Sequence, residues 1–139
     1  MRMALVLVGS LLILAGCQHF DRARQCRALA DGVNPELKEI SLMFSKRSPT
    51  GAAEYRDLAK RYAAVAVRIQ KLRLTEPELN RLAQAVGVNL QNVSRSSDLL
   101  ASLLGHPETS AAQAATHDLE AQRQAHLTTV GMIDKFCQD

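Results

Sequence analysis

Apolar residues between Tyr55 and Leu72 recur at spacings of three and four, and this pattern constrains the fold more than any other feature of the chain. Residues at these spacings share one face of an α-helix, whereas a half-buried strand needs an alternation of two. The segment therefore predicts an amphipathic helix whose apolar stripe packs against other helices. The stripe consists of Tyr55, Leu58, Tyr62, Val65, Ile69 and Leu72.

Three further segments show the same helical period. A first helix is predicted from Cys26 to Phe44, with a kink or a break at Asn34-Pro35 because proline removes a backbone donor. Thr75-Glu76-Pro77-Glu78 is typical of a capping box with proline in the first turn, and it predicts a helix that runs to Gly105. We expect a bend or fraying in that helix around Gly87, Asn89 and 94–97. The serines of 94–97 are interpreted as surface serines. A last helix is predicted from Pro107-Glu108 onward.

The composition favours the same fold class. Aromatic residues make up only 4% of the chain and tryptophan is absent, which disfavours a β-sandwich. Four helices with short connections predict an all-α, antiparallel up-down four-helix bundle over residues 25–139.

The N-terminus is too apolar to belong to such a bundle. Arg2 is the only charge before a run of 13 residues from Met3 to Ala15. A membrane span needs roughly 20 residues, whereas the apolar region of a signal peptide has about 7 to 15. The run therefore predicts a signal peptide.

Leu14-Ala15-Gly16-Cys17, where this run ends, resembles the lipobox of bacterial lipoproteins. This resemblance implies that residues 1–16 are cleaved, that Cys17 carries a diacylglyceryl group with acyl chains such as palmitate, and that 17–24 form a short tether or an extra helical turn. Gln18, in place of aspartate, implies export to the periplasmic face of the outer membrane. The alternatives are an ordinary secretory signal or a short membrane anchor, either with a free Cys17.

Once Cys17 is assigned to lipid, Cys26 and Cys137 remain as a pair. An oxidising compartment favours a disulfide between them, and the up-down topology brings the two ends of the domain together. Two free thiols or a redox pair are the alternatives. Neither cysteine lies in a C-x-x-C motif, so the structural disulfide is preferred.

The sequence contains no motif for catalysis or metal binding. His19, His106, His117 and His126 do not have the spacing of zinc or di-iron ligands. No serine lies in a hydrolase motif, and there is no glycine-rich phosphate loop. We therefore predict no enzyme, no metal and no cofactor.

Gln122 and His126 occupy the apolar stripe of the last helix, where polar groups must find partners. They predict a polar core layer with Asn89 or Ser96 opposite, or else an exposed edge. A sharper hypothesis is haem held by His126 and a methionine, Met43 or Met132, on a facing helix.

Positive charge is concentrated in the second helix. Removal of Arg2 with the signal peptide leaves a net charge of +2, which is weak evidence for nucleic-acid binding, and none is predicted. Lys60, Arg61, Arg68 and Lys71 form either a solvated face paired with acids on neighbouring helices or a surface for anionic lipid headgroups, cell-wall polymers or an acidic protein.

Two functions fit these observations. The preferred one is a non-enzymatic structural or protein-interaction module of the cell envelope, anchored by lipid on Cys17 and bound to an envelope protein. The alternative is a carrier of a small ligand or a haem-type cofactor within the bundle.

Overall fold

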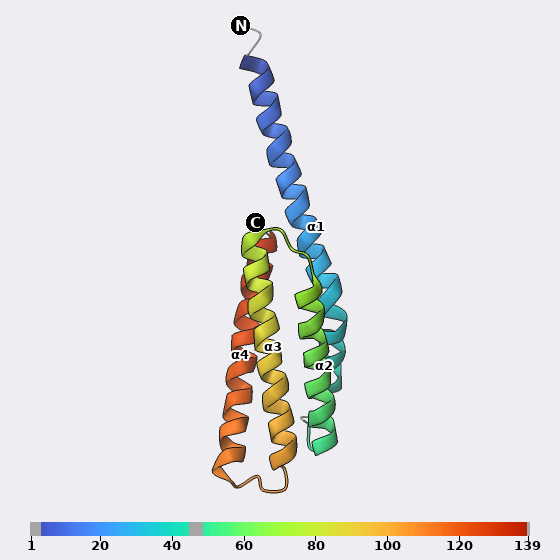
Figure 1. Cartoon of the computed structure of the whole chain (residues 1–139), viewed down its shortest axis with the longest axis vertical. Helices are drawn as coiled ribbons and strands as arrows, with labels where there is room; N and C mark the ends of the chain where they lie inside the picture. Colours follow the sequence, from blue (N-terminus) through green and yellow to red (C-terminus); the bar gives the residue numbers. More distant parts are fainter. Residues whose placement is uncertain (1–3, 45–48, 139) are drawn as a thin grey trace.

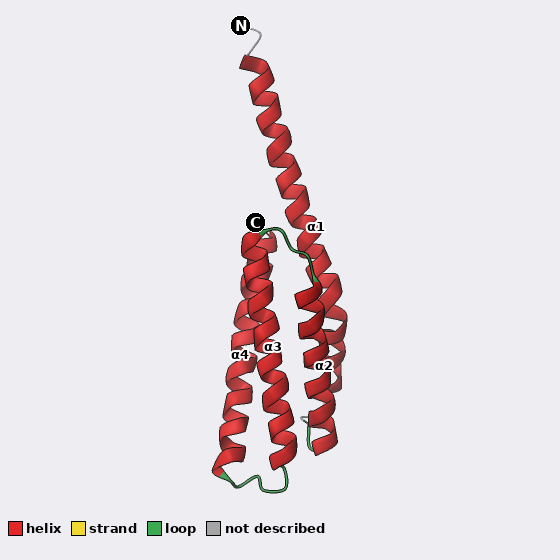
Figure 2. Ribbon diagram, viewed as in Figure 1, coloured by secondary structure: helices red, strands yellow, loops and turns green. Residues whose placement is uncertain are grey.

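The computed structural model describes the backbone of residues 4–44 and 49–138, and the side chains of 20–43 and 49–138. Within these ranges the chain forms four helices and no strand: α1 (Ala4–Phe44), α2 (Ala52–Lys71), α3 (Pro77–Leu103) and α4 (Ser110–Gln138). Successive helices run in opposite directions and form a four-helix bundle, which confirms the predicted fold class (Figure 1). The ribbon is helical throughout apart from the short connections (Figure 2).

α1 is much longer than the other helices, and its N-terminal part projects beyond the bundle (Figure 1). Residues 17–24 continue this helix, so the segment expected as a tether or an extra turn is helical. The predicted signal peptide and the side chains of Leu14–Cys17 lie outside the residues whose side chains the structure describes.

α1 continues through Pro35, so a break at this residue was a wrong prediction. Pro35 has no N–H to donate to the carbonyl of Asp31, one turn earlier. Both residues face solvent. Water can therefore satisfy the carbonyl, and the helix absorbs the proline on its outer side.

The core is densest where α2 and α3 pack together. Val65, Ala66 and Ile69 of α2 and Leu79, Ala83 and Leu90 of α3 are completely shielded from solvent. Leu29 and Val33 of α1 complete this cluster. In α4, by contrast, only Ala112 and Ala115 are buried.

Two predictions about α3 were wrong. Its N-cap is Glu76, with no side-chain hydrogen bond, so the capping box at Thr75 does not form. The helix is continuous through its middle, so the expected fraying does not occur, and Ser96 and Ser97 are buried and bonded rather than on the surface. Ser97 donates to its own helix at Val93 O (2.8 Å), whereas Ser94 bridges to Ala59 O of α2 (2.8 Å).

Gln25 supplies the cap that Thr75 was expected to provide. Its Oε1 accepts hydrogen bonds from the backbone N–H groups of Thr75 (2.7 Å) and Glu76 (3.0 Å), at the start of α3. Its Nε2 donates to Thr75 Oγ1 (2.9 Å) and to Asp21 Oδ2 (2.8 Å). A buried side chain of α1 therefore holds the α2–α3 connection.

The Sγ atoms of Cys26 and Cys137 lie 2.02 Å apart, which is the bonding distance of a disulfide. They join α1 to the last turn of α4, and Arg22 lies over the ring of Phe136 one turn away. We call this the closed end of the bundle. Elsewhere α1 packs mainly on α2 and contacts α4 little.

Candidate functional site

The separation of α1 and α4 away from the closed end leaves a groove of about 740 Å³. Leu37, Ile40 and Ser41 of α1 form one wall, and residues of α4 between Thr116 and Leu127 form the other. We call this the α1–α4 groove. Its volume lies within the range of about 300 to 1,000 Å³ that is usual for small-molecule sites.

The groove has an apolar base and one polar wall. Leu58 of α2 and Val93 of α3 contribute to the lining and are almost fully buried. The α4 wall instead presents Glu120, Arg123 and His126 between apolar neighbours. An amphipathic occupant therefore has a surface for each of its two sides.

His126 is the most unusual residue of the groove. Its Nδ1 atom is buried and is the one buried side-chain nitrogen or oxygen without a hydrogen-bond partner in the described part of the chain. Burial lowers the pKa of the imidazole, so the ring is neutral at pH 7. A buried polar atom without a partner costs free energy, and a bound molecule that supplied a partner would recover it.

Tyr62 contributes a second neutral group. Its ring lines the groove from α2, and burial raises the pKa of the phenol, an effect that nearby Arg123 partly offsets. No described residue accepts or donates a hydrogen bond at its hydroxyl. Arg123 itself is paired with Glu120 on the same helix at 3.2 Å, so the charges of this wall cancel locally.

The predicted polar layer does not form as a single cluster. Asn89 donates to Thr129 Oγ1 (3.3 Å), and Gln122 accepts a hydrogen bond from Asn92 (3.4 Å). Further along, Ser96 donates to Asp118 Oδ2 (2.7 Å). These pairs are spread along the α3–α4 interface, and His126 takes part in none of them.

The four predicted basic residues have different environments. Arg61 bonds Asp57 (2.9 Å) on its own helix and Glu36 (2.9 Å) on α1, and Arg68 lies 3.7 Å from Glu36. These two arginines therefore help to fasten α1 to α2. Lys60 and Lys71 are exposed and form no ion pair with the described residues.

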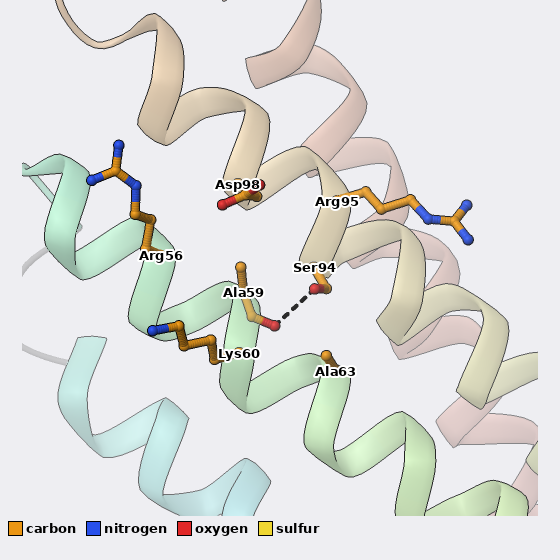
Figure 3. Close-up of a pocket in the computed structure, with 7 residues that line it drawn as sticks. All are labelled: Arg56, Ala59, Lys60, Ala63, Ser94, Arg95 and Asp98. Carbon is orange, nitrogen blue, oxygen red and sulfur yellow. Dashed lines mark hydrogen bonds between the residues drawn. The ribbon is translucent and has the colours of Figure 1, made fainter.

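Lys60 borders a second, shallow hollow of about 290 Å³ between α2 and α3 (Figure 3). Small side chains at Ala59, Ala63 and Ser94 create the space. The guanidinium groups of Arg56 and Arg95 point away from one another and from the hollow, so they do not converge on an anion (Figure 3).

The structure brings no methionine to His126. Met43 and Met132 are both about half exposed, and neither lines the α1–α4 groove. Among the side chains that the structure describes, no three His, Cys, Asp or Glu residues gather in a way that could hold a metal ion. In the same part of the chain, no helix is long and apolar enough to cross a membrane.

Sequence reasoning identified His126 from its place on an apolar stripe but missed the groove around it. Tyr62 was assigned to the core stripe of its helix, and Glu120, Arg123 and Leu127 were not singled out. Polar residues interrupting the stripe of α4 were the available signal, but they do not reveal that α1 stands apart.

Comparison of the chain with protein-family models, with curated proteins and with solved structures finds no match.

Proposed function

We propose that this protein is a lipid-anchored module of the bacterial cell envelope that acts by binding another protein and not by catalysis. The observation that carries the proposal is the pairing of Cys26 with Cys137. Their pairing leaves Cys17 as the remaining cysteine, within the lipobox-like Leu14-Ala15-Gly16-Cys17. A disulfide also fits an oxidising compartment such as the periplasm.

The direction of α1 supports attachment at the closed end. α1 leaves the bundle there and leads back to residue 17, nine residues before Cys26. At a rise of 1.5 Å per residue, about 14 Å of helix would separate a lipidated Cys17 from the disulfide. The bundle would then stand at the periplasmic face of the outer membrane on a short stalk.

The charges at the closed end suit a membrane surface. Five cations there lack a carboxylate partner among the described residues, although Asp134 and Glu76 are nearby in the sequence. Each basic residue near an anionic membrane contributes about 1 kcal/mol. These cations are Arg22, Arg27, Lys71, Arg73 and Lys135.

Labelling with radioactive palmitate tests the anchor. The wild-type protein is expected to incorporate label and sediment with outer membranes, whereas Cys17→Ser is expected to do neither. Cys137→Ser serves as the control, because it removes a cysteine without touching the lipobox. Sedimentation of unlabelled Cys17→Ser with membranes after a high-salt wash would contradict the lipid anchor.

Crosslinking in whole cells tests the partner. The proposal expects one protein to crosslink to the exposed surface of the bundle at stoichiometric yield. Charge reversal of Lys60, which forms no intramolecular ion pair with described residues, is expected to weaken that crosslink if the basic face is the contact. Arg61→Glu is a poorer test, because it also breaks the contact with Glu36.

A second candidate function is carriage of a small ligand, and the unpartnered Nδ1 of His126 in the α1–α4 groove favours it. Solvent extraction of purified protein followed by mass spectrometry is expected to release one small molecule per chain. The absence of methionine from the groove lining argues against a His–Met haem site, and a Soret band after addition of haem would contradict that argument.

A further inference from the structure

We propose that the α1–α4 groove binds a single-chain acyl amphiphile with an uncharged, hydrogen-bonding head group. This inference rests on the second candidate function, and it assigns the chemical class of the ligand. It depends on three features of the groove: its volume, its apolar base and the charge state of its polar groups.

The volume of the groove suits a small molecule. It measures about 740 Å³, which lies within the range of about 300 to 1,000 Å³ that is usual for small-molecule sites. The α4 wall from Thr116 to Leu127 is about 16 Å long at 1.5 Å per residue, so the groove is elongated along the helix.

The apolar part of the lining suits the acyl chain. It consists of Leu37 and Ile40 in the α1 wall and of Leu58 and Val93 at the base. Each methylene buried on such a surface raises affinity by about fourfold. Chain length should therefore control the affinity.

The polar groups select an uncharged head. The imidazole of His126 and the hydroxyl of Tyr62 are both neutral, and neither has a hydrogen-bond partner among the described residues. Arg123, the cation of the lining, lies 3.2 Å from the carboxylate of Glu120, so an anionic head group would meet a negative charge beside the positive one and gain no net attraction. Hydroxyl or ester groups need only hydrogen bonds, which the neutral groups of the groove can supply.

A displacement assay tests the inference on the chain that begins at Gln18. The buried side chains of the described bundle lie between Gln25 and Ala115, and the disulfide links Cys26 to Cys137, so this chain retains the whole core. The probe is N-phenyl-1-naphthylamine, whose fluorescence rises in apolar surroundings. We expect one probe molecule per chain, displaced at pH 7.5 more effectively by monododecanoylglycerol than by dodecanoate.

Variants locate the site. His126→Leu should weaken binding of monododecanoylglycerol about fivefold, which corresponds to one lost hydrogen bond. His117→Leu is the matched control, because His117 is an exposed histidine on the same helix outside the groove, and its binding should equal that of the wild type. Thr116→Trp and Leu127→Trp fill the groove from exposed positions and should abolish binding of the probe.

The outcomes distinguish failure of the carrier function from failure of the proposed ligand class. Suppose that both tryptophan variants are folded by circular dichroism and still bind the probe as the wild type does. The groove would then not be the binding site, and the carrier function would fail with it. If dodecanoate displaces the probe as effectively as monododecanoylglycerol, the groove does not select an uncharged head group. The carrier function would still stand. Loss of membrane attachment in Cys17→Ser bears on neither outcome.

Discussion

The side chain of Gln25 makes four hydrogen bonds although only 7% of its surface is exposed, and it links α1 to the start of α3. Its acceptor oxygen serves the backbone N–H groups of Thr75 and of Glu76, the N-cap of α3. Few side chains of this fold connect two segments so far apart in the sequence. We therefore expect its loss to be costly.

Gln25→Leu keeps the size of the side chain but removes every one of these bonds. The free energy of unfolding should fall by about 1 to 3 kcal/mol, because the N–H groups of Thr75 and Glu76 lose their acceptor in a partly buried place. Gln84→Leu, at an exposed position of α3, should change stability by less than about 0.5 kcal/mol. Urea denaturation measures both, and equal effects of the two changes would refute the role of Gln25.

His126 should make stability depend on pH. Its pKa in the folded protein is below the ordinary value of 6.5, so below that pH the unfolded chain binds a proton that the folded chain does not. The contribution of His126 is therefore complete above about pH 7, begins to be lost near pH 6.5, and is lost fully as the pH falls through the lower pKa of the folded state. Tyr62, the other groove group with a shifted pKa, stays neutral in this range, because burial raises the pKa of its phenol.

The difference in unfolding free energy between the wild type and His126→Gln isolates this effect, since His106 and His117 are present in both. Urea denaturation at pH 7.5, 6.5 and 5.5 should show the wild type losing stability relative to the variant. A difference that stays constant with pH would mean that the imidazole titrates as it does in water.

At the scale of helices, the position of α2 could be predicted from its apolar residues. Their spacing of three and four can be recognised within the segment itself, without knowledge of the rest of the chain. The start of α3 was harder to predict. The capping box at Thr75 is a local pattern, but the true acceptor, Gln25, lies 50 residues away from it. Local patterns cannot predict a bond between distant segments.

The same limit explains what sequence reasoning found and missed at the candidate site. His126 was recognised because a polar residue on an apolar stripe is unusual. The groove could not be recognised, because it arises from the distance between α1 and α4, which depends on how α1 packs against α2. Asn89 and Gln122 were grouped with His126 by their helical positions, yet they bond Thr129 and Asn92 instead.

Pro35 provides a prediction for α1. Pro35→Ala restores the hydrogen bond to the carbonyl of Asp31 and should raise the free energy of unfolding by about 1 to 2 kcal/mol, after allowance for the greater entropy of the unfolded chain. Asn34→Ala, at the adjacent exposed position, should gain only the difference in helix propensity, about 0.5 kcal/mol. A loss of stability in Pro35→Ala would show that the proline gives α1 a shape that the packing needs.

At the scale of the whole molecule, the bundle is fastened unevenly. α3 packs on both α2 and α4, whereas α1 is held by its apolar face on α2, by the pairing of Glu36 with Arg61, and by the disulfide to α4. The disulfide closes a loop of 111 residues, for which loop-closure entropy corresponds to about 4 to 5 kcal/mol as an upper value. Because α1 is one wall of the groove, the disulfide also limits how far the groove can open.

Replacement of both Cys26 and Cys137 by serine should therefore loosen α1 selectively. Hydrogen exchange measured by mass spectrometry should show the largest loss of protection in residues 26–43, a smaller loss in the last turns of α4, and little change in α3, whose core contacts are intact. The wild type with the disulfide reduced is the control and should behave in the same way, since it keeps every other side chain. Equal loss of protection across all four helices would mean that the bundle unfolds as one unit, and that the disulfide stabilises the whole fold without regulating the width of the groove.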